Sequence, residues 1–174
     1  MAIGGGLIVL LVGYLLFAPP SNNNKKGAQF AGGGTNPNIA DTAGPGDLDT
    51  WELRLPGATA LVTDERLIPT GEIEVAGTDL DFGTGRVIGE QALDTAFGGL
   101  TRDDDGWAEV RLRGDREVVL RMDGHHRWVQ AFTGPPGRRD GLALEPMTAP
   151  PNAFASGDDL LVLEPGVPLT VRWT

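Results

Sequence analysis

Two acidic residues in apolar surroundings are the strongest candidates for acid–base chemistry. Glu145 follows the apolar run at 142–144, at the end of a predicted strand and directly before a proline. A carboxylate that is partly removed from water has a raised pKa, which suits it to act as a general base. Asp94 lies between the apolar residues Leu93 and Phe97 and is predicted to point inward. The pattern alone also allows structural roles, with the aspartate in a turn and the glutamate paired with an arginine.

The other polar clusters are typical of surface turns. His125 and His126 are adjacent, so on a strand they would point to opposite faces and would not readily share a metal ion. The acidic run 103–106 resembles half of a calcium loop, but it lacks the alternating ligands and the distant glutamate of an EF-hand. Residues 138–140 follow Pro-Pro-Gly and predict an exposed loop. No serine lies in a nucleophile elbow, and we predict no metal site.

Short strands separated by Gly, Pro and Asp turns predict that the body of the chain is all-β. The clearest element is a hairpin in which residues 107–113 and 116–122 alternate between apolar and charged side chains. Further strands are predicted at 51–55, 58–63, 73–76, 126–133, 142–145, 160–164 and 169–173. These strands predict a β-sandwich or part of one.

The N-terminal segment is the candidate for membrane contact. Residues 3–18 form an uncharged segment. This segment is slightly shorter than the roughly 20 residues that span a bilayer. We interpret them as a single membrane anchor, with Lys25 and Lys26 on the cytoplasmic side. A cleaved signal, a buried strand and a spurious extension are the alternatives, and without a real anchor the protein would be cytoplasmic.

Composition and charge restrict the classes of protein further. The 174 residues include 14 basic and 24 acidic side chains and no cysteine, and the net charge is −10. Such a balance argues against nucleic-acid binding, and the lack of cysteine excludes disulfides and thiolate chemistry. We predict an apolar anchor or signal-like segment at 1–18, a flexible Gly/Asn/Pro-rich linker at 19–48 and a β-sandwich at 49–174.

Several segments of the body contain motifs that follow one another in a recognisable order. They are PTGEIEVAGTDLDF at 69–82, LDTAF at 93–97, HRWVQAFTG at 126–134, LEPMTAPPNAF at 144–154 and SGDDLLVLEPGVPLTVRW at 156–173. In this order they resemble the C-terminal part of the aldose 1-epimerase (galactose mutarotase-like) family. The resemblance covers about residues 51–173 and does not extend to residues 1–48.

The resemblance implies part of a galactose mutarotase-like β-supersandwich, which binds a free hexose and interconverts its α and β anomers without a metal or organic cofactor. Glu145 matches the family's glutamate, which takes the proton from the anomeric hydroxyl, and Asp94 matches an aspartate that hydrogen-bonds sugar hydroxyls. In the family a histidine protonates the ring oxygen, and it comes from an N-terminal half that has no counterpart here. His125 and His126 do not match that histidine.

The missing half predicts an exposed apolar sheet face. Through this face the chain would associate with a partner that supplies the other half, or with itself. Activity of the chain alone is therefore in doubt. The alternatives are a non-catalytic carbohydrate-binding β-sandwich, tethered to a membrane by residues 3–18, and a non-functional fragment.

Overall fold

A computed structural model describes residues 7–8, 47–134, 139 and 141–174 of the chain. Nearly all of the regular structure is β, as predicted. The strands are β1 (Leu7–Ile8), β2 (Glu52–Arg54), β3 (Thr59–Thr63), β4 (Pro69–Glu74), β5 (Arg86–Val87), β6 (Asp94–Gly98), β7 (Ala108–Arg113), β8 (Glu117–Met122), β9 (Trp128–Phe132), β10 (Ala143–Met147) and β11 (Val162–Leu163). Two helical turns accompany them, η1 (Leu48–Thr50) and α2 (Ala153–Ser156).

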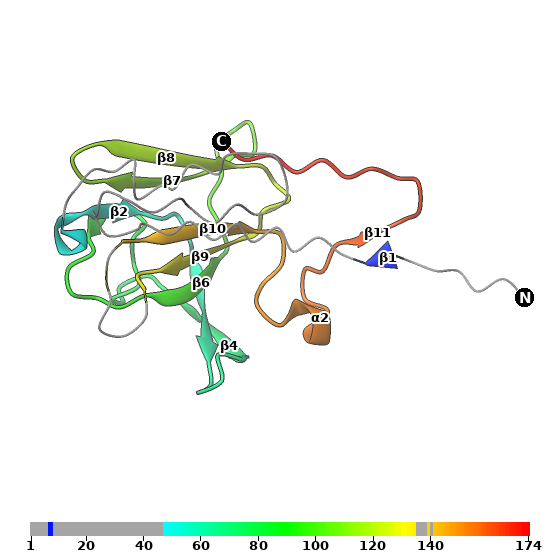
Figure 1. The fold of residues 1–174 in the computed structure, drawn as a ribbon, viewed down its shortest axis with the longest axis horizontal. Coiled ribbons are helices and arrows are strands. Elements are labelled where there is room, and N and C mark those ends of the chain that lie inside the picture. The colour runs from blue at the N-terminus through cyan, green and yellow to red at the C-terminus, as the bar shows by residue number, and fades with distance from the viewer. Residues whose placement is uncertain (1–6, 9–46, 135–138, 140) are drawn as a thin grey trace, which may run out of the picture.

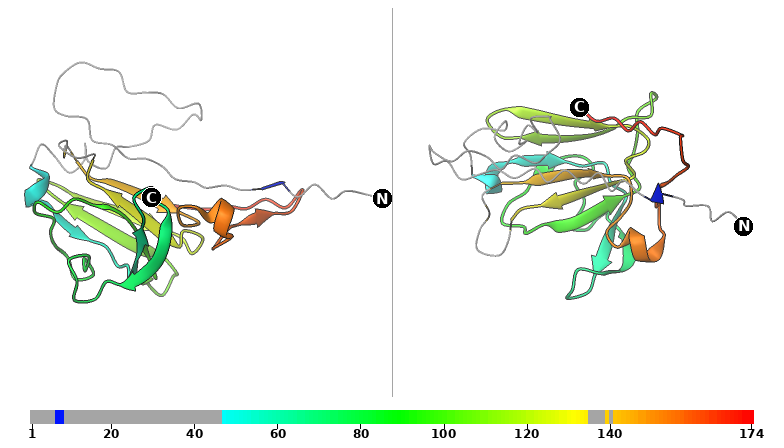
Figure 2. Two further views of the ribbon diagram at one scale, coloured as in Figure 1. Left: turned by 90° about the horizontal axis from the view of Figure 1, so that it is seen from below. Right: turned by 45° about the vertical axis from the view of Figure 1, so that its right-hand side comes forward.

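The main strands form two antiparallel sheets. A five-stranded sheet has the order β10-β9-β6-β3-β4, and a four-stranded sheet has the order β5-β2-β7-β8. Figure 1 shows β10, β9 and β6 side by side, with β7 and β8 along the adjacent sheet. The short strands β1 and β11 pair with each other, and Figure 2 shows α2 and β11 to one side of the two sheets.

The hydrophobic core lies between the two sheets because alternate residues of each strand point inward. Leu53 and Leu112 of the four-stranded sheet share this core with Phe97 and Val129 of the five-stranded sheet, and all four are fully buried. Phe82, from the loop after β4, contacts Phe97 edge-on, with the ring centroids 6.3 Å apart. The molecule is therefore a β-sandwich.

The predicted β7–β8 hairpin is confirmed. Its register runs from Ala108 opposite Met122 to Arg113 opposite Glu117. The alternation of buried and outward residues on β7 follows the apolar and charged alternation of the sequence. A two-residue period thus predicted both the pairing and the buried face.

Two predicted strands begin or end at other residues. The return strand β4 begins at Pro69 rather than at residue 73, because the Asp64 side chain accepts hydrogen bonds from the backbone N–H groups of Arg66 and Ile68 and closes the turn earlier. β10 continues past Glu145 to Met147. It is an edge strand, where a proline does not interrupt the ladder.

The C-terminal prediction was partly wrong. The strand predicted at 160–164 is reduced to Val162–Leu163, and the segment predicted at 169–173 forms only an isolated bridge between Trp173 and Met122. Thr174 and Arg121 exchange two backbone hydrogen bonds of 2.8 and 2.9 Å. The C-terminal residues therefore cover part of the outer edge of β8, which a sheet edge requires.

The predicted anchor and linker fall almost entirely outside the described residues. Of the segment 1–18, only residues 7–8 are described, as strand β1. Of the linker 19–48, residues 47 and 48 are described, and Leu48 is buried in the core. No helix within the described part of the chain is long and apolar enough to cross a membrane.

Candidate active site

The outer face of the five-stranded sheet brings the two predicted acids onto one surface. Glu145 on β10 lies opposite Gln130 on β9, and Gln130 lies opposite Ala96 on β6. Asp94 precedes Ala96 by two residues, so its side chain belongs to the same face. Three adjacent strands therefore place Glu145, Gln130 and Asp94 together, although they are up to 51 residues apart in the sequence.

Strand alternation and one buried threonine position these acids. Leu144 points into the core, which directs the next residue, Glu145, to the outer face. The Thr133 hydroxyl accepts a hydrogen bond of 2.9 Å from the backbone N–H of Leu93, and the Thr133 N–H donates to the Leu93 carbonyl at 3.0 Å. The start of β6, and with it Asp94, is thereby tied to the end of β9.

Asp94 does not point inward as predicted. Its side chain is exposed, while the preceding residue, Leu93, occupies the core. The two apolar neighbours of the sequence motif predicted burial, but the pleat of β6 sends the carboxylate to the opposite side from Leu93. An exposed carboxylate on a sheet face is available to hydrogen-bond a ligand.

The environment of Glu145 favours its protonated form. Burial, and to a smaller extent the negative charge of Asp94, raises the pKa of Glu145 to about 7. No arginine within the described residues forms an ion pair with Glu145, which argues against the paired structural role considered from the sequence. A carboxylate with a pKa near neutrality can both accept and release a proton at physiological pH.

Gln130 is the member of this group that sequence reasoning missed. Its Nε2 donates a hydrogen bond of 2.7 Å to Oδ1 of Asp94. Its Oε1 is buried and has no hydrogen-bond partner among the described residues. The alternation of the predicted strand 126–133 already put this glutamine on the polar face, but no contact to an acid could be inferred before the strand order was known.

A small apolar cluster lies beside the polar group on the same face. It consists of Ala96, Trp128 and Met147, with Leu61 packed against them. The indole Nε1 of Trp128 donates to Oδ2 of Asp159 at 2.8 Å, which ties the C-terminal segment to the sheet. Because Ala96, Trp128 and Met147 are almost completely buried, this cluster stabilises the strands that carry the polar group.

The two histidines lie in the turn before β9 and differ from each other. His125 is exposed, whereas the side chain of His126 is fully buried, so the predicted solvated turn is wrong for His126. His126 Nδ1 lies 3.1 Å from Oδ1 of Asp123, and burial lowers the pKa of His126. Arg102 donates to the His126 carbonyl at 2.6 Å, so this region is held by structural contacts.

The acidic run and the arginine loop also have structural contacts. Asp103 Oδ1 accepts hydrogen bonds from the backbone N–H groups of Asp105 and Trp107, which makes the predicted surface turn. Arg139 is not simply exposed: it donates at 2.5 Å to Oδ1 of Asp49 and bonds two backbone carbonyls. The neighbouring residues 138 and 140 lie outside the described residues.

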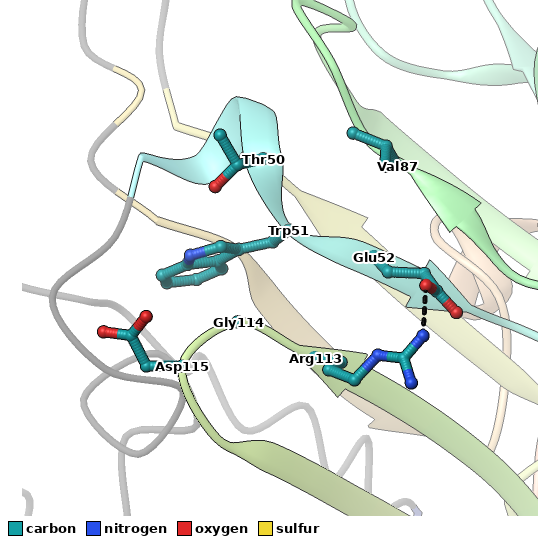
Figure 3. A pocket seen from close by; sticks show the side chains of 7 residues that line it. All are labelled: Thr50, Trp51, Glu52, Val87, Arg113, Gly114 and Asp115. Atoms are coloured by element: carbon teal, nitrogen blue, oxygen red, sulfur yellow. Dashed lines mark hydrogen bonds and ion pairs between the residues drawn. The ribbon is translucent and has the colours of Figure 1, made fainter.

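Two cavities in the described part of the chain lie away from Glu145 and Asp94. One, of about 290 Å³, is lined by Thr50, Trp51, Glu52, Val87, Arg113, Gly114 and Asp115 (Figure 3). Its Glu52 and Arg113 pair with each other at 2.5 Å. The other, of about 410 Å³, contains Arg54 and Glu109, which also form an ion pair. In each of these two ion pairs the charges compensate each other. The outer face of the five-stranded sheet is therefore the stronger candidate for the active site.

Comparison with known proteins places the chain in a family. Residues 38–173 match the family described as aldose 1-epimerase. The chain therefore belongs to the aldose 1-epimerase family. It is 34% identical over 121 residues to the uncharacterized protein YihR of Escherichia coli K12, a match that covers 70% of this chain and 38% of YihR.

Solved structures of similar proteins have the same fold. A GalM/aldose epimerase homologue from Caenorhabditis elegans matches with a TM-score of 0.55 and 17% identity, covering 72% of this chain and 44% of that chain. A galactose mutarotase-like protein from Clostridium acetobutylicum matches with a TM-score of 0.58 and 14% identity, covering 73% and 40%. The fold is thus galactose mutarotase-like. The chain spans less than half the length of each of these proteins.

Proposed function

We propose that the chain binds a free hexose on the outer face of the five-stranded sheet and takes part in interconverting its α and β anomers. The observation that carries the proposal is the position of Glu145, which lies half-buried beside Gln130 and Asp94 on an open face with a pKa near 7. Membership of the aldose 1-epimerase family supports the reaction class.

In the proposed reaction Glu145 acts as the general base. Its carboxylate takes the proton of the anomeric hydroxyl, the electron pair of that O–H bond forms the C1 carbonyl, and the bond from C1 to the ring oxygen breaks. The ring oxygen takes a proton from a general acid, the C1–C2 bond rotates, and the reverse steps close the ring on the other face. General acid–base assistance of this kind contributes roughly 10²–10⁴-fold to a rate.

Asp94 would hold the sugar during these steps. An exposed carboxylate accepts hydrogen bonds from hydroxyl groups, and Asp94 lies two strands from Glu145 on the same face. Trp128 and Met147 are buried beside these strands and hold them in place, rather than presenting apolar surface to the sugar. Hydrogen bonds to Asp94 would orient the anomeric hydroxyl towards Glu145, which is the contribution of positioning to catalysis.

The general acid is proposed to come from a part of an epimerase-length protein that this chain does not span. The chain covers 38% of YihR, and no histidine within the described residues lies on the outer face that carries Glu145. Association of this face with a polypeptide that supplies the acid would complete the site. Such a complex would be detected by a rise in mutarotation rate when the chain is mixed with that polypeptide.

Mutarotation of pure α-D-glucose and α-D-galactose, followed by polarimetry or proton NMR, tests the proposal. A rate above that of buffer is expected when a polypeptide that supplies the general acid is associated with the chain, and it should disappear in Glu145→Gln. Glu109→Gln is the matched control, since Glu109 is a half-buried strand glutamate on the outer face of the other sheet. A rate equal to that of buffer for the unmodified chain, alone and in association, would contradict the proposed reaction.

A non-catalytic carbohydrate-binding role is the second candidate. The observation that favours it is the small share of YihR that the chain covers, because binding groups are present while the acid must come from elsewhere. It predicts a sugar-dependent rise in melting temperature that is lost in Asp94→Ala, with no change in mutarotation rate. Mutarotation above buffer by the isolated chain would exclude this candidate.

A further inference from the structure

We propose that Gln130 is a positioning residue for the base: its amide oxygen accepts a hydrogen bond from the protonated carboxyl of Glu145 while its amide nitrogen donates to Asp94. The inference rests on the proposed function only for the role of Glu145 in the reaction. The contacts themselves are properties of the chain without any sugar.

The orientation of the Gln130 amide follows from its contact with Asp94. Its Nε2 lies 2.7 Å from Oδ1 of Asp94, and an ionised carboxylate only accepts hydrogen bonds. The reversed amide would bring two acceptor oxygens together. Asp94 therefore fixes the nitrogen on its own side and leaves Oε1 as the free end of the amide.

The free end of the amide is an unsatisfied buried acceptor. Oε1 of Gln130 is shielded from solvent and has no hydrogen-bond partner in the part of the chain that the structure describes. A buried polar atom without a partner costs free energy, so a donor that reaches it is stabilised. The structure thus contains a vacant acceptor position in the middle of the candidate site.

Among the described residues, the strand neighbours of Gln130 on this face leave one side chain that can supply the donor. Its direct neighbour on β6, Ala96, has no polar side-chain atom. Along β9 the flanking residues on this face are Phe132, whose side chain has no N–H or O–H group, and Trp128, whose Nε1 donates to Asp159 instead. On β10 the direct neighbour is Glu145.

The flanking positions on β10 do not change this result. Ala143 and Met147 share the face with Glu145 and carry no hydrogen-bond donor. A carboxyl group is a donor only in its protonated form, which burial and the charge of Asp94 already favour for Glu145. Gln130 therefore recognises the state of Glu145 that exists after it has taken a proton.

The charged groups that the strands themselves place on this face are few and, among the described residues, all acidic. Asp94 on β6 is the one whose charge acts on Glu145. Glu72 and Glu74 lie two strands further, on the far edge strand β4, while Asp159 is bound both by Trp128 and by the guanidinium of Arg127. Gln130 separates the two nearest carboxylates and gives each a polar partner, which would hold both in place when a proton is transferred.

Carbon-13 NMR titration of the full-length labelled chain without sugar tests this inference. The side-chain carbonyl carbon of Gln130 is expected to shift with the same midpoint as the Glu145 carboxyl carbon. The carbonyl carbon of Gln91, whose amide binds Asp79 and Arg86, is the internal control and should not follow that midpoint. A Gln130 signal that stays constant while Glu145 titrates would overturn the inference.

A variant gives a second, independent readout. Gln130→Met keeps the length of the side chain and removes the amide, so the Glu145 midpoint should fall by about one pKa unit, the size of one hydrogen bond to the protonated form. Gln91→Met should leave the midpoint unchanged. An unchanged or raised midpoint in Gln130→Met contradicts the role, and the titration of the unmodified chain decides the question if that variant does not fold. Because no sugar is present, failure of the mutarotation assay alone would leave this result standing.

Discussion

The outer faces of the two sheets use the same strand alternation for opposite purposes. On the four-stranded sheet the outward carboxylates lie next to arginines: Glu52 pairs with Arg113 at 2.5 Å, and Glu109 pairs with Arg111 at 2.6 Å. On the five-stranded sheet Glu145 has no cation beside it among the described residues. The charge that acts on it comes from a second acid, Asp94.

The two faces consequently have different electrostatic properties. Hydrogen bonds and charges from the paired glutamates raise the pKa of Arg111 and Arg113, so that face consists of compensated charges. On the five-stranded sheet, burial without a cation raises the pKa of Glu145 to about 7. Pairing gives a solvated surface, whereas removal from water without pairing gives a group that can exchange a proton near neutral pH.

The largest expected effect comes from closing the space under Trp128. A Cβ on Gly98 would lie 2.7 Å from the indole ring, closer than real contacts allow. Gly98→Ala should therefore destabilise the fold by about 3 kcal/mol, the upper end of overpacking effects. Gly71→Ala on β4 is the control, because a Cβ there meets nothing within 4 Å. Equal denaturation midpoints for the two variants would show that the Trp128 contact is not rigid.

The next effect concerns the stability cost of Glu145. Its pKa is raised from 4.5 to about 7, so its contribution to stability is fully present below pH 4.5 and is lost as the pH rises through 7. We compare the free energy of unfolding of Glu145→Gln with that of the unmodified chain. After allowance for partial exposure, this difference should be about 2 kcal/mol more in favour of the variant at pH 8 than at pH 4.5. Urea unfolding at both pH values measures this difference. A constant difference between the two proteins would mean that the pKa is not raised.

A smaller effect is expected when the second acid is neutralised. Asp94→Asn removes the negative charge that acts on Glu145 but leaves its burial unchanged. Because burial is the main cause of the shift, the Glu145 midpoint should fall by about half a pKa unit and remain above 4.5. Carbon-13 NMR titration measures the midpoint. A fall all the way to 4.5 would show that charge, and not burial, sets the pKa.

The smallest effect is expected on the charged face. A double-mutant cycle on Glu52 and Arg113 should give a weak coupling that disappears in concentrated salt, because the pair is exposed to solvent. The Glu145 midpoint should not change in either variant. A strong, salt-resistant coupling would contradict the distinction between the two faces.

The sequence predicted elements whose pattern is local. The alternation of β7 and β8 was sufficient to place their buried face, and the family motifs pointed to Glu145 and Asp94 before any geometry was known. Gln130 could not be predicted, because its role depends on β10, β9 and β6 being adjacent, and these strands are distant in the sequence.

Where the prediction was wrong, side chains had changed the local structure. The start of β4 depends on the Asp64 side chain, which closes the preceding turn. The burial of His126 depends on its contact with Asp123 and on Arg102, whose guanidinium reaches the His126 carbonyl. Neither contact follows from hydrophobic pattern or turn propensity, so the predicted solvated turn around His126 was reasonable but incorrect.

Mapping of sugar binding by NMR tests the central claim most directly. D-glucose or D-galactose is added to the labelled full chain, and the backbone and side-chain signals of both sheets are followed. The account predicts that signals of Asp94, Gln130 and Glu145 shift in a saturable manner, while those of Arg111 and Arg113 do not. Saturable shifts on the four-stranded sheet, or no shift on either sheet, would contradict it.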